Sequence, residues 1–111
     1  MKNLLAIVSL AAATSLASSA LAQNTGDLTL IIKDHRFTPT ELVVPAGKKF
    51  KLIIDNQDAT PEEFESKPLR VEKVIPGKRK ATLNLGPLKP GSYPFVGEFN
   101  EATAKGILHA K

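Results

Sequence analysis

Two segments of the chain carry closely spaced oxygen donors that suit metal chemistry. The first segment holds Glu62 and Glu63, and the second holds Glu98, Asn100 and Glu101. Carboxylates that lie close together repel one another unless a proton or a cation joins them. Such a set suits hard cations, or ferric and cupric ions, bound weakly with water completing the shell. The alternative interpretation is that these acids are solvated loop residues.

The two histidines are the remaining candidates for metal ligands. His35 lies between Asp34 and Arg36, and it is either an additional ligand or a residue that faces solvent. A Cu(II) site built from His35 and carboxylates is compatible with these residue types. His109 stands near the end of the chain, where we expect a surface position.

The chain has no sulfur ligand for a blue-copper site. It contains no cysteine, and its single methionine is Met1. A type-1 copper centre requires a thiolate with two imidazoles, so this class of site is excluded on chemical grounds. We also find no Ser-His-Asp set, phosphate-binding glycine loop or zinc-ligand spacing. An enzyme is therefore not the expected class, although an accessory ferroxidase activity stays open.

The beginning of the chain has the pattern of a secretory signal peptide. Lys2 precedes an apolar stretch that is too short for a stop-transfer helix, and Ala20-Leu21-Ala22 forms a small-residue cleavage signal. An uncleaved membrane anchor is the alternative. The pattern predicts removal of residues 1–22, one domain over residues 23–111, a periplasmic location and no membrane span after cleavage.

Charge and aromatic content argue against nucleic acid as a partner. The formal net charge is +4, but the basic residues are spread out except at Lys78-Arg79-Lys80, which reads as a solvated hairpin tip. Aromatic side chains make up 5% of the chain and are not interleaved with that run.

Alternating hydrophobicity predicts that short β-strands position these groups. Turn-forming residues separate seven or eight such runs, and no sustained helical stripe occurs after the leader. This pattern predicts an all-β, Greek-key β-sandwich. Pro94 lies inside one run, which predicts an edge strand or a bulge there. We expect Tyr93 to bury its ring and to bond a loop carbonyl through its hydroxyl. The candidate core residues are Leu30, Ile32, Phe37, Leu42, Val44, Phe50, Leu52, Ile54, Leu83, Leu85, Tyr93, Phe95 and Ile107.

The order of several motifs resembles that of the cupredoxins. Phe37-Thr38-Pro39 followed by Val44-Pro45-Ala46-Gly47 is similar to the opening of that fold, and residues 51–58 are similar to its strand ending in an N-x-D turn. Residues 91–108 resemble the metal loop of the cupredoxins in the order of their residue types. In that loop the resemblance places Gly97 at the Cys position, Asn100 at the His position, and Thr103 or Ala104 at the Met position.

The resemblance is strongest to the small secreted cupredoxin-like proteins of bacterial iron and copper uptake. The Glu63-Phe64-Glu65-Ser66 segment and the Gly97-Glu98-Phe99 loop carry it, whereas Asn100 stands where those proteins have histidine. Glu62 or Glu63 would occupy the place of the first histidine ligand, and the resemblance favours Glu63. It also implies that the two acidic segments meet at one end of the sandwich.

The resemblance implies an exported protein that binds a copper or iron ion and assists iron uptake. The implied partner is a membrane iron permease or another periplasmic uptake component. The alternative is a metal-free interaction module that kept the sandwich and lost the metal.

Overall fold

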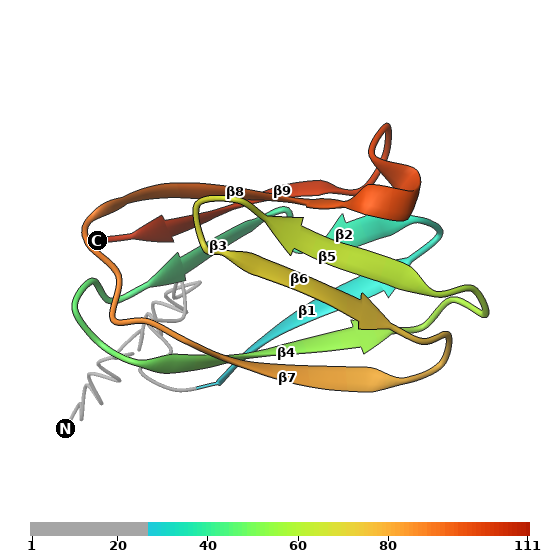
Figure 1. The fold of residues 1–111 in the computed structure, drawn as a ribbon, viewed down its shortest axis with the longest axis horizontal. Coiled ribbons are helices and arrows are strands. Elements are labelled where there is room, and N and C mark those ends of the chain that lie inside the picture. Colours follow the sequence, from blue (N-terminus) through green and yellow to red (C-terminus); the bar gives the residue numbers. More distant parts are fainter. Residues whose placement is uncertain (1–26) are drawn as a thin grey trace, which may run out of the picture.

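Two β-sheets pack face to face in the computed structural model, which describes residues 27–111 (Figure 1). The expected signal peptide and its cleavage site lie outside the described residues. A four-stranded sheet has the order β2-β1-β4-β7, and a five-stranded sheet has the order β3-β9-β8-β5-β6. The strands are β1 (Asp27–Lys33), β2 (Arg36–Thr38), β3 (Glu41–Val44), β4 (Phe50–Asn56), β5 (Glu62–Ser66), β6 (Val71–Ile75), β7 (Lys80–Leu85), β8 (Gly91–Gly97) and β9 (Lys105–Ala110).

The predicted all-β sandwich is confirmed. The pairs β1–β4 and β3–β9 are parallel, whereas the other pairs are antiparallel. Beyond the expected runs the structure contains β2, a three-residue strand that pairs with the end of β1. Within residues 27–111, the helical structure is the single 3-10 turn η1 (Glu98–Asn100), and no helix there is long and apolar enough to cross a membrane.

Residue alternation builds the core between the two sheets. In β4, the side chains of Phe50, Leu52 and Ile54 are buried, while the intervening Lys51 and Ile53 face outward. This alternation is the period-2 pattern of a half-buried strand. Burial of each of these large side chains stabilises the fold by roughly 1.5–3 kcal/mol relative to an exposed position.

Three phenylalanines from different strands form the aromatic part of the core. The ring centroids of Phe37 and Phe95 are 5.2 Å apart with an edge-on geometry, and those of Phe64 and Phe95 are 5.1 Å apart. These separations are in the favourable range for aromatic pairs. Because Phe37 lies on β2 and the other two lie on the five-stranded sheet, the cluster ties the two layers together near the loop end.

The phase of the last strand differs from the predicted core. Leu108 and Ala110 are buried, whereas Ile107 and His109 face outward. A shift of one residue moves every side chain of a strand to the other face, and the run Gly106-Ile107-Leu108 is apolar in either phase. Leu83, Leu85 and Tyr93, also predicted for the core, are half-buried at its margin.

Two local predictions concern β8. The Tyr93 hydroxyl donates a hydrogen bond to the Lys89 carbonyl at 2.7 Å, as expected. Pro94, predicted for an edge or a bulge, lies in a central strand. However, β5 pairs with β8 only at Val96 and Gly97, and the Ser66 hydroxyl donates to the Pro94 carbonyl at 2.8 Å. Pro94 thus stands where one side of the strand lacks a ladder partner, so its missing N–H breaks no ladder bond.

Candidate metal centre

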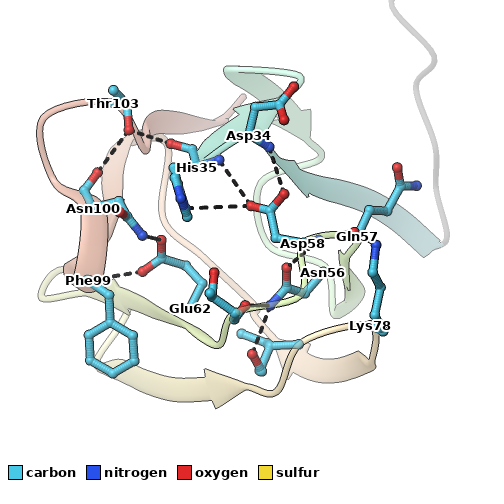
Figure 2. A network of polar contacts seen from close by, with 12 residues as sticks. Asp34, His35, Asn56, Gln57, Asp58, Glu62, Lys78, Phe99, Asn100 and Thr103 are labelled. Carbon is cyan, nitrogen blue, oxygen red and sulfur yellow. Dashed lines mark hydrogen bonds and ion pairs between the residues drawn. The ribbon is translucent and has the colours of Figure 1, made fainter.

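Four segments, two of which are consecutive in sequence, meet at one end of the sandwich. They are the β1–β2 turn, the loop after β4, the start of β5, and η1 (Figure 2). Asn56 is fully buried at the end of β4, and its amide donates to the carbonyls of Thr60 at 2.9 Å and Ile75 at 3.0 Å. The same side chain accepts the N–H of Asp58 at 3.1 Å. Asn56 therefore fixes the loop that leads into the acidic segment.

Asp58 joins that loop to the β1–β2 turn. Its carboxylate accepts the N–H groups of Asp34 at 2.8 Å and His35 at 3.0 Å. Both turn residues have positive φ angles of 53° and 56°, a conformation that Asp and His tolerate better than most residues. The hydrogen bond from the His35 N–H is the largest influence that lowers the pKa of Asp58 below its ordinary value of 3.8.

His35 is held by this turn rather than by the acidic segments. Its Nδ1 lies 3.7 Å from Asp58 Oδ2, and its backbone carbonyl accepts a hydrogen bond from the Thr103 hydroxyl. Figure 2 shows the imidazole directed toward Asp58. The structure thus pairs His35 with Asp58, a residue that the sequence analysis did not predict as a metal ligand.

Glu62 is buried and fully hydrogen-bonded at the start of β5. It is 1% exposed, and its Oε2 accepts a hydrogen bond from Asn100 Nδ2 at 2.7 Å. Its Oε1 accepts the N–H groups of Phe99 at 2.9 Å and Glu63 at 3.0 Å. Figure 2 shows the carboxylate aimed at η1. Glu62 therefore clamps η1 onto β5.

Gly97 provides the space that this clamp occupies. A Cβ atom at Gly97 would lie 2.7 Å from the Glu62 carboxyl carbon and 2.7 Å from the Ala104 Cβ. Both distances are too short for any side chain at this position without movement of its neighbours. The glycine at the expected cysteine position is thus required by the packing.

The residues at the implied copper position do not fit a copper centre of the blue type. Gly97 offers no ligand, and the side chains of Glu62 and Asn100 bond to each other. Every buried side-chain nitrogen and oxygen within residues 27–111 has a hydrogen-bond partner, so none is left oriented toward a missing ion. Since the chain also lacks a thiolate, no step through type-1 copper applies.

A second acidic group lies on the outer face of the five-stranded sheet. Carboxylate oxygens of Glu63, Glu72 and Glu98 lie within 4.8 Å of one another. Glu63 points outward because the flanking Glu62 and Phe64 point inward. Glu72 comes from the neighbouring strand β6, and Glu98 from η1. We call Glu63, Glu72 and Glu98 the outer carboxylate cluster.

Glu65 extends this cluster along the same face. It lies opposite Glu72 in the β5–β6 ladder. A hydrogen bond with the Glu98 carboxylate is the main cause that raises the pKa of Glu65 above its ordinary value of 4.5. The repulsion from the same carboxylate acts in the same direction. The two acids therefore favour a shared proton or cation.

The structure places the six predicted ligands in four separate settings. Glu63 and Glu98 come together, whereas Glu62 and Asn100 form the buried clamp and His35 pairs with Asp58. Glu101 is exposed and lines a shallow hollow with Glu65 and Glu98.

Sequence reasoning did not nominate Glu72 or Glu65. Alternation along β5 places Glu65 on the same face as Glu63, and this signal was available in the sequence. Glu72 required knowledge of the β5–β6 register.

Comparison with known proteins defines the family. The chain matches the model of the cupredoxin-like domain over residues 6–110. It belongs to the cupredoxin-like domain family. A relative is the uncharacterized protein RP394 of Rickettsia prowazekii (strain Madrid E), which is 43% identical over 82 residues and 74% of this chain. The match spans 66% of that protein's length.

Solved structures with the same fold include copper proteins. An apo copper-binding protein solved by NMR aligns with a TM-score of 0.68 at 15% identity, over 79% of this chain and 90% of its own. Auracyanin A, a blue copper protein of Chloroflexus aurantiacus, aligns with a TM-score of 0.63 at 13% identity, over 77% of this chain and 98% of its own. The metal-binding domain of the Streptococcus pneumoniae Cu(I)-exporting ATPase CopA aligns with a TM-score of 0.66 at 11% identity, over 79% of this chain and 88% of its own. At these low identities, the TM-scores show that the fold is shared and nothing more.

Proposed function

We propose that this protein is an exported cupredoxin-like protein that binds a copper or iron ion at the outer carboxylate cluster. The observation that carries this proposal is the convergence of Glu63, Glu72 and Glu98 within 4.8 Å of one another. Three ionised carboxylates at this spacing repel, and a bound cation relieves the repulsion. An all-oxygen site suits ferric or cupric ions better than soft Cu(I), with water completing the shell.

The proposed role is capture of the ion and its transfer to a membrane iron permease or another periplasmic uptake component. The exposed positions of Glu72 and Glu98 support transfer, because a partner's ligands can reach an ion held at the surface. The resemblance of the Glu63-Phe64-Glu65-Ser66 segment to proteins of iron and copper uptake supports the pathway.

Isothermal calorimetry with Cu(II), Fe(II) and Fe(III) tests the binding step. We expect saturable binding of at least one ion, weakened on the order of tenfold by Glu63→Gln or by Glu98→Gln, because each removes one charged ligand. Glu41→Gln is the matched control, since Glu41 lies on β3, which β9 and β8 separate from β5 in the same sheet. Absence of saturable heat, or heat unchanged in both cluster variants, would overturn the proposal.

A metal-free interaction module is the second candidate function. The Glu62–Asn100 clamp favours it, because the implied copper position is filled by the protein's own hydrogen bonds. A partner that binds equally well with and without a chelator would support this candidate. Loss of the partner on metal removal would contradict it.

A further inference from the structure

The two faces of the sandwich differ in charge. The outer face of the five-stranded sheet, together with η1, carries six acids, with the basic residues Lys67, Arg70 and Lys105 beside them. These acids are Glu41, Glu63, Glu65, Glu72, Glu98 and Glu101. The outward positions of the four-stranded sheet are mixed, with Lys33, Arg36, Lys51 and Lys80 beside Asp27 and Asp55. A chain of net charge +4 thus presents one acidic face.

Two shallow hollows meet on this acidic face. One hollow, of about 440 Å³, lies over β8 and β9 and is lined mainly by apolar atoms, among them those of Pro94, Val96 and Ile107. The other, of about 420 Å³, shares Pro94 and Val96 and is bordered by three acids, Glu65, Glu98 and Glu101, and by one base, Lys67. The hollows therefore form a continuous surface with an apolar floor and an acidic margin. We call it the β8 surface.

Two exposed apolar side chains lie next to members of the outer carboxylate cluster. Phe99 in η1 is 52% exposed, and Val74, which lies opposite Glu63 in the β5–β6 ladder, is 47% exposed. They are the large apolar side chains most exposed within residues 27–111. Apolar groups gathered at one acidic margin are typical of an interaction surface rather than of scattered surface residues.

We propose that the β8 surface binds an extended segment of a partner protein in which basic and apolar residues alternate. The apolar side chains would cover Pro94, Val96 and Ile107, and the basic side chains would reach Glu65, Glu98 and Glu101. An extended chain fits this layout because its alternate side chains point to opposite sides. Charge complementarity with the acidic margin selects a basic segment and excludes an acidic one.

A second copy of this chain fits the surface less well. Lys33, Arg36, Lys51 and Lys80 lie on the opposite sheet, so a contact through them would be head-to-tail and would form rings or open assemblies rather than two-fold dimers. The proposal of a separate basic partner rests on the second candidate function, the metal-free interaction module. It adds the chemical class of the partner that this module would bind.

Titration of the ¹⁵N-labelled protein with peptide, followed by nuclear magnetic resonance in the presence of a chelator, tests the proposal. The probe is an acetylated and amidated hexapeptide of alternating arginine and leucine, and its counterpart of alternating glutamate and leucine is the control. We expect saturable shifts at the amides of Val96, Lys105 and Ile107 with the basic peptide alone. Shifts confined to β1, β4 and β7, equal responses to both peptides, or no saturation would overturn the proposal.

Paired variants identify the charges that matter. The double substitution of Glu65→Gln and Glu98→Gln should raise the Kd of the basic peptide about fivefold, as expected for two partly exposed ion pairs. The matched double substitution of Asp27→Asn and Asp55→Asn removes the same charge from the other sheet and should leave the Kd unchanged. Equal effects of the two pairs would contradict the assignment. Thermal melting of each variant verifies that it is folded.

A third variant and a sedimentation experiment separate the remaining outcomes. Ile107→Thr reduces the apolar floor without a change in charge, and it should also weaken peptide binding. Analytical ultracentrifugation measures the oligomeric state of the free protein. A dimer of the wild type that is absent in the Glu65→Gln, Glu98→Gln variant would overturn the partner assignment in favour of a second copy. Because a chelator is present throughout, the result is independent of metal binding at the outer carboxylate cluster. A metal-independent partner that binds elsewhere would leave the interaction module standing while the β8 surface fails.

Discussion

Glu62 and Glu63 are neighbours in sequence, yet the structure gives them opposite environments. Glu62 is buried and accepts three hydrogen bonds, whereas Glu63 faces outward into the carboxylate cluster. Strand geometry is the cause, because successive side chains in a strand point to opposite faces. The dipeptide therefore combines a structural role for Glu62 with the proposed ligand role of Glu63.

The first prediction compares the same substitution at these two positions. Glu62→Gln should lower the free energy of unfolding by about 1–3 kcal/mol, because one buried oxygen that now accepts from Asn100 becomes an amide donor. Glu63→Gln should change stability by less than about 0.5 kcal/mol or raise it slightly, since it removes a repelling charge. Urea unfolding followed by circular dichroism measures both. Equal losses in the two variants would contradict the clamp.

The second prediction concerns the pH dependence contributed by Glu65. Its pKa is raised in the folded protein, so its favourable protonated contact with Glu98 is fully present below the ordinary value of 4.5 and is lost as pH rises through the folded pKa. Glu65→Gln should therefore raise the Tm at pH 7, whereas the difference should disappear at pH values below that ordinary value. Thermal melts at pH 7 and at a pH below 4.5 measure this difference in Tm. Asp27→Asn is the control, and its Tm difference from the wild type should not follow this trend.

At the scale of elements, the loop end is held by side chain to backbone hydrogen bonds rather than by a metal. Asn56 orders the β4–β5 loop, Asp58 attaches the β1–β2 turn to it, and Glu62 attaches η1 to β5. Each bond joins a backbone group of one segment to a side chain of another. The end of the sandwich is therefore held in place without a coordinated ion.

The third prediction tests the attachment of the β1–β2 turn. Asp58→Ala removes the acceptor of the Asp34 and His35 N–H groups and should cost about 1–2 kcal/mol, a modest value because these groups are solvent-accessible. The pKa of Asp58 is lowered in the folded protein, so its contribution is present above 3.8 and is lost as pH falls through the folded pKa. The wild type and the variant should converge in stability at low pH, as measured by urea unfolding across pH 2–7. A constant difference across that range would contradict the role of the ionised carboxylate.

At the scale of the whole molecule, the two proposed binding sites lie apart from the copper position that the family resemblance implies. The outer carboxylate cluster and the β8 surface both lie on the five-stranded sheet, outside the core. They share Glu98, so a bound cation would reduce the negative charge that attracts a basic partner. Metal and partner would then compete, and calorimetry of the basic peptide with and without the ion measures that competition.

The fourth prediction concerns export. If residues 1–22 are a signal peptide, the protein recovered from the periplasm of an expressing bacterium begins at Gln23. Intact-mass measurement identifies this end directly. Replacement of Ala20 and Ala22 by bulky residues should block cleavage and leave the longer form, because the processing site accepts small side chains.

The sequence by itself determined most of the strands, the fold family and the absence of a blue-copper site. Alternation of apolar residues marks most strands, and a missing thiolate excludes that chemistry in any fold. Only the tertiary structure decided which acids meet, because that depends on strand phase and on the β5–β6 register. Pairing between strands brought Glu72 to Glu63 and turned Glu62 inward, and no local pattern encodes those long-range contacts.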